Sequence, residues 1–256
     1  RAGLAAMVRT VAGQQNRKKQ TGKANPAAAR PPVRLHVRVR RLFWRTTGAV
    51  TLAVLAAAAL FAVVNPPTTH TIWSETRRLG TVERRWVAME EIAPVMARSV
   101  VAAEDANFCL HWGFDMDAIR AALADGAVRG ASTLSQQTVK NVYLWQERSW
   151  TRKAIEALVT PALEAVWSKR RILEVYMNVA EFDEGVFGIA AAAERHFGVP
   201  ASDLSPMQAA RLAVVLPSPK TRDPARLSPA LERRAAMIAD GAATIDRDGR
   251  AACFQD

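Results

Sequence analysis

The stretch RKAIEALVTPALEAVWS, residues 152–168, predicts how the folded part of this chain is built. Apolar residues recur in it at intervals of three and four, the spacing of an amphipathic helix with a wide face toward the core. Pro161 lies inside this pattern and is expected to kink or split the helix. The apolar residues are Ile155, Leu158, Val159, Ala162, Leu163, Val166 and Trp167.

The neighbouring segments extend the prediction of a helical fold. β-branched runs are short and alanine is abundant, so strands are weakly indicated. Two Ser-Pro pairs, at 205–206 and 228–229, are typical helix starts. We therefore expect a mainly α fold in one compact domain. The further expected helices run over 171–178, from 206 to Leu216, and from 229 to near Gly241.

The positive charge of the chain lies mostly in its first part. The net charge of +11 alone would suggest a nucleic-acid partner, but residues 1–45 hold 12 of the 35 Lys and Arg and no acidic residue. The remaining residues carry 23 basic and 24 acidic side chains and are close to neutral. The charge therefore belongs to a basic tail that is expected to be largely disordered, and no nucleic-acid partner is predicted.

An uncharged segment, residues 46–64, follows this tail. It includes GAVTLAVLAAAALFAVV and would form a helix of about 28 Å, close to the roughly 30 Å thickness of a bilayer core. Five arginines precede it within residues 34–45, which predicts a single-pass anchor with a cytoplasmic N-terminus. A cleaved signal peptide or a buried core helix is the alternative. The long basic segment before the apolar residues and the Asn-Pro-Pro after them favour the anchor. Because residue 1 is Arg, Met7 is a candidate translation start.

Five parts are expected along the chain. They are a basic tail at 1–45, a membrane-spanning helix at 46–64, a juxtamembrane linker at 65–79, the folded domain at 80–242 and a loose C-terminal tail at 243–256.

The cysteines and histidines carry little information about chemistry. Outside the cytoplasm a disulfide between Cys109 and Cys253 can form. Their distance in sequence and the position of Cys253 in the predicted tail do not support it. The four histidines are scattered, and none pairs with a cysteine at a zinc-like interval. No metal site is predicted.

Two adjacent carboxylates lie in the run AAEDANFCLHWGFD, residues 102–115. Burial raises the pKa of a carboxyl group toward neutrality, where it can exchange a proton, so Glu104 and Asp105 are candidates for general acid–base chemistry. By itself, such a pair often only caps a helix.

Two further segments combine hydroxyl groups with cations. In GASTLSQQTVKN, residues 130–141, Thr133 and Gln136 have capping-box spacing, and a helix start near Lys140 suits a phosphate or diphosphate. Arg152 and Glu156 share a helix face. Taken alone, that pair reads more simply as an exposed ion pair of little energetic value.

In their order and spacing, these segments resemble the peptidoglycan glycosyltransferase family over roughly residues 80–240. The patterns E-D-x-x-F-x-x-H-x-G-x-D, G-x-S-T-x-x-Q-Q-x-x-K-N and R-K-x-x-E are complete, SKRRILEVYMN at 168–178 matches a fourth motif, and Gly185 and Gly188 resemble the fifth. The sequence looks most like the monofunctional branch, the biosynthetic transglycosylases. Neither S-x-x-K nor K-T-G occurs in it, so no transpeptidase activity is expected.

The resemblance implies a lysozyme-like α-helical glycosyltransferase domain, anchored in a bacterial inner membrane and exposed to the periplasm. It implies transfer of the growing undecaprenyl-diphosphate-linked strand to the GlcNAc 4-hydroxyl of lipid II, with inversion, a β-1,4 product and release of undecaprenyl diphosphate. The expected partners are lipid II, the nascent glycan strand, the membrane and other cell-wall synthesis or division proteins. No cofactor is required by the sequence, although a divalent cation at the diphosphate is compatible with it.

The resemblance also assigns roles to residues of the site. Glu104 is the candidate base for the acceptor hydroxyl, and Glu156, oriented by Arg152, is expected to position the donor diphosphate or a bound cation. Lys140 and Lys153 would join Arg152 in neutralising the charge that develops on that group. The residues expected to bind the substrate or to shape its site are Asp105, Phe108, Ser132, Thr133, Gln136, Gln137, Lys140, Asn141, Arg152, Lys153, Lys169, Glu174, Tyr176 and Asn178.

Large apolar residues flank the motifs, and the sequence leaves open whether they face the membrane or the core. A site that acts on a lipid must reach the bilayer, where exposed aromatic side chains lie in the interface. The better candidates for membrane contact are Trp112, Phe114 and Met116, and the others are Tyr143, Leu144, Trp145 and Trp150.

Two other functions remain to be distinguished. A lytic enzyme that cuts the same glycan would also use a glutamate in a lysozyme-like domain, but Lys140, Arg152 and Lys153 have no task in cleaving a neutral glycosidic bond. An inactive cell-wall scaffold is the second alternative, and the complete motifs argue against it.

Overall fold

The structure is a computed structural model that describes residues 35–124, 126 and 132–255. Most of the predicted basic tail, and Gly130 and Ala131 of the second motif, therefore lie outside the described residues. The chain divides into two units, residues 1–46 and 47–256.

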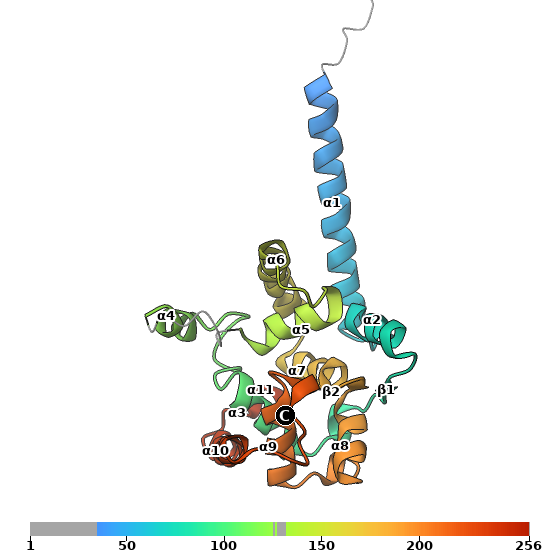
Figure 1. Cartoon of the computed structure of the whole chain (residues 1–256). Helices are drawn as coiled ribbons and strands as arrows, with labels where there is room; N and C mark the ends of the chain where they lie inside the picture. Colours follow the sequence, from blue (N-terminus) through green and yellow to red (C-terminus); the bar gives the residue numbers. More distant parts are fainter. Residues whose placement is uncertain (1–34, 125, 127–131, 256) are drawn as a thin grey trace, which may run out of the picture. The chain divides into compact units, whose positions relative to one another are not determined.

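The membrane-spanning prediction falls on helix α1, Leu35–Phe61 (Figure 1). The helix begins earlier than the predicted 46, since no glycine or proline interrupts residues 35–45, and it ends at Phe61 instead of Val64. The last residues of the predicted tail are therefore helical. The segment His36–Phe61 is long and apolar enough to cross a membrane.

Side chains of the folded domain hold the C-terminal end of α1. The Trp167 indole Nε1 donates to the carbonyl of Ala58 at 2.7 Å, and Ala58 is fully buried. The Arg171 guanidinium donates to the carbonyls of Phe61 at 3.1 Å and Val64 at 3.0 Å. The bond to Phe61 satisfies a carbonyl that a helix end leaves without a partner, and the three bonds together fix the end of α1 against the domain.

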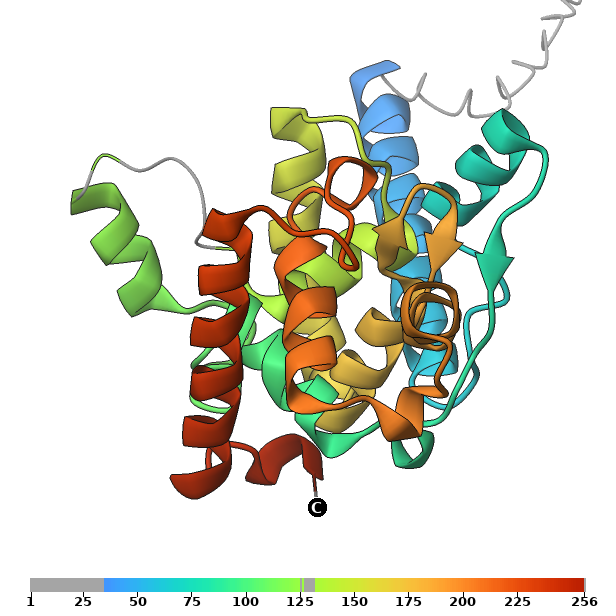
Figure 2. The same ribbon diagram turned by 60° about the horizontal axis from the view of Figure 1, so that its bottom comes forward.

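Three helices pack together on one side of the core: α3 (Pro94–Glu104), α9 (Pro206–Val215) and α10 (Pro229–Arg247). Figure 2 shows them side by side, with α10 in dark red and α9 in orange. The prediction that the last helix ends near Gly241 is wrong. Gly241 lies inside α10, where a Cβ would stand 3.2 Å from that of Ala102 on α3, so its small size allows close packing.

The other half of the core surrounds α5 (Leu134–Tyr143), which packs against α6 (Trp150–Val166) and α7 (Lys169–Val179). Helix α6 runs through Pro161 without a break, so the expected split is absent. Its core face is also narrower than predicted, because Leu158 is 78% exposed and Val166 is 42% exposed.

Short elements complete the domain. Helix α2, His70–Leu79, occupies most of the predicted linker, and its Ile72 is buried. The three-stranded sheet has the order β1-β3-β2, with β1 parallel and β2 antiparallel to β3. The remaining elements are β1 (Glu83–Arg84), η1 (Met89–Glu91), α4 (Met116–Ala124), β2 (Glu181–Asp183), β3 (Val186–Phe187), α8 (Ile189–Phe197), η2 (Ala201–Asp203), η3 (Pro219–Thr221) and α11 (Ala252–Gln255).

The predicted loose C-terminal tail is instead part of the fold. Cys253 forms a disulfide with Cys109 across 144 residues of sequence, a bridge that their spacing did not support. Phe254 is fully buried, and its ring centroid lies 6.3 Å from that of Phe108. The tail is ordered because the covalent link and the buried ring attach it beside the predicted catalytic segment.

The mainly α prediction is confirmed.

Candidate active site

Glu104 is the last residue of α3 and is half-buried. Gln137 on α5 donates from Nε2 to Glu104 Oε2 at 2.8 Å, and the Tyr176 hydroxyl donates to Gln137 Oε1 at 3.2 Å. Burial raises the pKa of Glu104, while the bond from Gln137 and the charge of Lys140 oppose that rise. Burial also raises the pKa of Tyr176, so its hydroxyl stays a donor. The carboxylate is thus held in place and prepared to accept a proton.

Asp105 joins two of the helices that form the site. Its Oδ2 accepts the backbone N–H of Leu134 at 2.9 Å, and its Oδ1 lies 2.9 Å from Nε2 of His111. A buried carboxylate at this helix start satisfies an N–H that would otherwise lack a partner. Asp105 thereby joins the end of α3 to the start of α5, which places Glu104 opposite Gln137. This contact set fits the expected shaping role.

Glu156 lies at the centre of a buried group of charges. The Arg152 guanidinium donates to Glu156 Oε2 at 2.7 Å, and Lys153 Nζ donates to Oε1. Glu156 and Arg152 are 2% and 8% exposed, so the alternative of a solvent-facing ion pair is wrong. Arg152 also donates from Nε to the carbonyl of Glu147 at 2.9 Å. One carboxylate thus orients two cations on the first turns of α6.

A continuous chain of contacts joins the two candidate glutamates. Gln137, bound to Glu104, also lies 3.5 Å from the carbonyl oxygen of Ser132. The hydroxyl of Ser132 accepts from Lys153 Nζ at 3.1 Å, and Lys153 binds Glu156. The two glutamates therefore belong to one site, although 52 positions separate them in sequence.

Lys140 adds a further cation to this site. It projects from α5 and is half-buried, and burial lowers the pKa of its ammonium group, whereas the charges of Glu156 and Glu104 raise it. Within the described residues its side chain makes no ion pair or hydrogen bond. Lys140 is therefore available to an anionic group bound between the two glutamates.

The start of α5 is built by the predicted capping box. The hydroxyl of Thr133 accepts from the N–H of Gln136 at 3.3 Å, and Oε1 of Gln136 accepts from the N–H of Thr133 at 3.1 Å. The Thr133 hydroxyl also donates to the carbonyl of Gly113 at 2.6 Å. Both side chains are buried, so they position the helix and its neighbours and do not line an open surface.

The remaining predicted residues lie around this centre. Phe108 is fully buried, with the ammonium group of Lys169 4.5 Å above its ring, so it supports the site from within the core. Asn178 is also buried and binds the backbone of Val87. Asn141 is half-buried and accepts from Gln146 at 3.2 Å.

Two of the predicted site residues form ion pairs with side chains that do not contact either candidate glutamate. Lys169 donates to Glu164 at 2.8 Å, and Glu174 accepts from Arg171 at 2.8 Å. Burial raises the pKa of Glu174. Arg171 also binds the carbonyls of Phe61 and Val64, so Glu174 orients the side chain that holds the C-terminal end of α1.

Sequence reasoning missed Glu164. It is 8% exposed and accepts from Ser135 on α5 as well as from Lys169. The signal was present in the sequence, because Arg152, Glu156, Thr160 and Glu164 recur at intervals of four and form one buried polar stripe along α6.

The flanking apolar residues divide between surface and core. Leu144 is buried, while Phe114, Tyr143 and Trp145 are half-buried. The exposed ones are Trp112 at 57%, Met116 at 52% and Trp150 at 90%. No residue of α4 is buried, and the helix stands at the edge of the domain in Figures 1 and 2. Trp112 and Met116 are thus exposed, as contact with a membrane requires, and Phe114 is exposed only in part.

The comparisons with known proteins agree with this geometry. Residues 69–243 match the family model described as Transglycosylase. A biosynthetic peptidoglycan transglycosylase of Jannaschia sp. (strain CCS1) is 62% identical over 207 residues, which is 81% of this chain and 85% of that protein. The corresponding protein of Rhodospirillum centenum is 51% identical over 179 residues, or 68% and 78% of the two chains.

A biosynthetic peptidoglycan transglycosylase of Salmonella arizonae is 48% identical over 193 residues, which is 71% of this chain and 80% of that protein. The family-model match, residues 69–243, includes the whole described site. The chain therefore belongs to the transglycosylase family and is a peptidoglycan glycosyltransferase of cell-wall biosynthesis.

Proposed function

We propose that this enzyme polymerises lipid II by transferring the growing glycan strand to the 4-hydroxyl of the GlcNAc of an incoming lipid II. The observation that best supports this proposal is that one site holds a candidate base at one end and a pair of cations at the other. A glutamate with a raised pKa lies at one end, and Arg152 and Lys153, oriented by Glu156, lie at the other. Such an arrangement suits removal of a proton from an acceptor and neutralisation of a departing diphosphate.

In this mechanism Glu104 accepts the proton of the acceptor hydroxyl as the new β-1,4 bond forms. In this same displacement the oxygen attacks the anomeric carbon of the donor from the face opposite the diphosphate, so the configuration inverts. The bond between the anomeric carbon and the diphosphate oxygen breaks, and undecaprenyl diphosphate leaves with the electron pair. Inversion needs the base and the leaving-group site on opposite faces of the sugar.

The cations act on the departing diphosphate. Arg152, Lys153 and Lys140 supply positive charge in a partly buried setting, where an ion interaction is stronger than in bulk water. Glu156 is a positioning residue, because both of its oxygens accept from cations. The described residues around it do not fit a protein-bound divalent cation, which would lie among positive charges. No step of the mechanism is routed through such a cation.

We further propose that α1 is a single-pass anchor in the bacterial inner membrane, with the enzyme domain in the periplasm. The arginines before the span favour a cytoplasmic N-terminus. The Cys109–Cys253 disulfide supports a periplasmic domain independently, because disulfides persist mainly in oxidising compartments.

The test is to supply the purified full chain with labelled lipid II and to analyse the product on a gel. The wild type is expected to form polymer, and Glu104→Gln to lose about 10²–10⁴-fold in rate, since it removes a general base without changing the size of the side chain. Glu194→Gln is the control, because Glu194 is exposed on α8. A wild type that forms no polymer, or an active Glu104→Gln, would overturn the proposal. Release of short glycans from finished cell wall would favour the lytic alternative.

A further inference from the structure

Glu164 on α6 is a buried carboxylate that takes no part in the proposed mechanism. Its side chain is 3% exposed, so it offers the substrate no surface. Its Oε1 accepts from Lys169 Nζ at 2.8 Å and from the hydroxyl of Ser135. Lys169 is the first residue of α7, and Ser135 lies in the first turn of α5. One carboxylate oxygen therefore joins three helices of the domain.

Lys169 connects this carboxylate to the segment that follows Glu104. Its ammonium nitrogen lies 4.5 Å from the centroid of the Phe108 ring. The ring attracts the cation, and the attraction is stronger where both groups are withdrawn from water. The side chain of Lys169 is 14% exposed, and Phe108 is fully buried. A cation so placed needs a fixed anion beside it, and among the described residues Glu164 is the carboxylate that pairs with it.

A short turn connects Phe108 to the candidate base. The N–H of Phe108 donates to the carbonyl of Asp105 at 3.0 Å, and the N–H of Asp105 donates to the carbonyl of Val101 at 2.9 Å. Asp105 is the C-terminal cap of α3, and Glu104 is the last residue of that helix. A displacement of the Phe108 ring is therefore passed to the helix end that carries Glu104.

Helix α6 also packs on the far end of the same segment. Gly113 has φ +81°, and a Cβ there would lie 2.9 Å from Cγ2 of Thr160 and 3.3 Å from Cγ of Glu164. The backbone thus approaches the buried stripe of α6 as closely as a glycine allows. Residues 105–113 are held by Glu164 twice, by direct packing at Gly113 and through its ion pair at Phe108.

We propose that Glu164 is a positioning residue for the transfer reaction. It acts through Lys169 and Phe108 on the orientation of Glu104. Without the carboxylate, the ammonium group of Lys169 turns away from the Phe108 ring, and the segment after Glu104 loses its fixed position. The base then lies out of line with the acceptor hydroxyl, while the groups that bind the substrate are unchanged. The inference rests on the proposed role of Glu104 as the base.

The first experiment measures kcat and KM of the purified full chain with labelled lipid II after Glu164→Met, which keeps the length of the side chain and removes its acceptors. We expect kcat to fall about 10²-fold, since a displacement of about 1 Å in a site costs this much, and KM to stay unchanged. Glu164→Gln keeps an acceptor oxygen for Lys169 and should recover part of the loss. Rates are compared at a temperature below the unfolding transition of every variant.

A double-mutant cycle tests the route through Lys169. Lys169→Met should lower kcat, and the variant with Glu164→Met added should be no slower than Lys169→Met alone, because coupled residues do not act additively. The double variant has no unpaired buried charge, so it is expected to fold even if Glu164→Met does not. Losses that multiply in the double variant would overturn the proposal. A Lys169→Met that raises only KM would assign Lys169 to the substrate and also overturn it.

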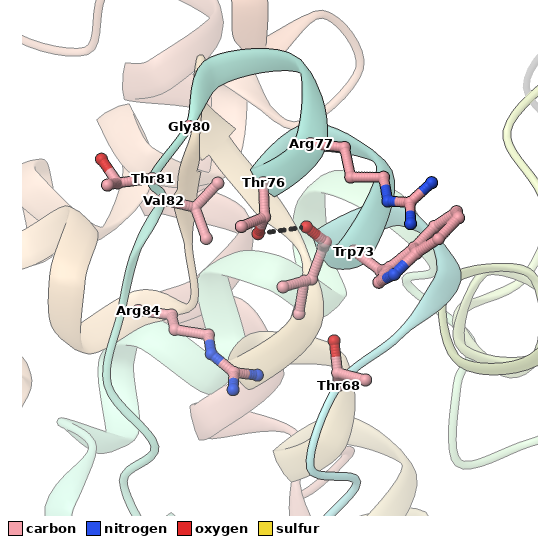
Figure 3. A pocket seen from close by; sticks show the side chains of 9 residues that line it. Thr68, Trp73, Thr76, Arg77, Gly80, Thr81, Val82 and Arg84 are labelled. Carbon is pink, nitrogen blue, oxygen red and sulfur yellow. Dashed lines mark hydrogen bonds between the residues drawn. The ribbon is translucent and has the colours of Figure 1, made fainter.

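The matched control is Glu75→Met. Glu75 lies on α2 and, like Glu164, accepts from two side chains, Arg78 at 2.8 Å and Lys220 at 2.6 Å. Helix α2 borders the open pocket in Figure 3, and the lining of that pocket contains none of the candidate site residues. The control variant should keep the kcat and KM of the wild type.

An equal loss of kcat in Glu75→Met, or an unchanged kcat in a folded Glu164→Met, would overturn the inference. If Glu104→Gln is inactive in the same assay, the proposed function stands despite that failure. If the wild type forms no polymer, the proposed function itself fails.

Discussion

At the scale of single residues, the carboxyl of Glu104, as the proposed base, is expected to determine the acid side of the pH–rate profile. A general base must be ionised, and burial raises its pKa, so activity should fall as the pH drops through a value above that of an ordinary glutamate. Gln137→Leu removes a bond that favours the ionised form. The acid limb of that variant should move to higher pH. The measurement is the polymerisation rate against pH, with Gln146→Leu as the amide control.

An acid limb that stays in place in Gln137→Leu would mean that the bond to Glu104 does not tune the base. A shift of equal size in Gln146→Leu would mean the same, because Gln146 bonds to Thr71 and Asn141 and not to Glu104.

Glu156 contributes to stability as well as to the site. Glu156→Gln leaves the buried Arg152 without its carboxylate, and breaking a buried pair commonly costs about 3–5 kcal/mol. The side chain of Lys153 is 40% exposed, so solvent screens part of its loss and we expect about 3 kcal/mol. Thermal unfolding of the full chain should show a fall in Tm of about 6–12 °C. Glu184→Gln, which removes an exposed partner of Arg78, should leave Tm unchanged.

The residues of the site differ in how far sequence reasoning could place them. The capping box of Thr133 and Gln136 follows from local spacing alone. The link from Gln137 to Glu104 does not, because it joins helices that start 40 residues apart in the chain. The roles of such residues depend on which helices pack together.

At the scale of elements, the start of α8 depends on a glycine. Gly188 has φ +84°, and a Cβ there would lie 2.8 Å from the carbonyl oxygen of Asn178 on α7. Gly198, at the other end of α8, has φ +65° and open space around it. Substitution of either by alanine should cost about 1–3 kcal/mol for the positive φ. Gly188→Ala should cost about 1–3 kcal/mol more, because the backbone must move.

The comparison of Gly188→Ala with Gly198→Ala by chemical unfolding separates the clash from the backbone strain. Equal losses of unfolding free energy in the two variants would show that α7 and α8 are not in close contact at this point.

Helix boundaries were predictable where local signals act. Ser205 and Ser228 cap α9 and α10 as expected. The continuation of α6 through Pro161 and of α10 past Gly241 was not predictable, because packing against neighbouring helices outweighs the local preference of one residue.

At the scale of the whole molecule, the disulfide joins the segment that follows Glu104 to the C-terminal end. It closes a loop of 144 residues, and loss of a bridge of this kind typically costs about 2–5 kcal/mol, because the unfolded chain gains freedom. A variant with Cys109→Ser and Cys253→Ser should have a lower Tm than the wild type. A reductant should lower the Tm of the wild type and leave that of the variant unchanged.

A wild type whose Tm does not respond to reductant would contradict this prediction. Loss of polymerising activity in the double serine variant at a temperature where it remains folded would show that the bridge also holds the catalytic segment.

The sequence by itself determined the helical class, the apolar segment long enough to cross a membrane, the family, and which residues are candidates for catalysis. Periodicity, charge and motif order are local properties that can be seen in an unfolded chain. Only the tertiary structure decided that Glu164 completes a buried stripe, that Cys109 meets Cys253, and that Ser132 connects the two candidate glutamates. Those relations depend on distances between remote segments, which arise when burial of the common core brings α3, α5 and α6 together.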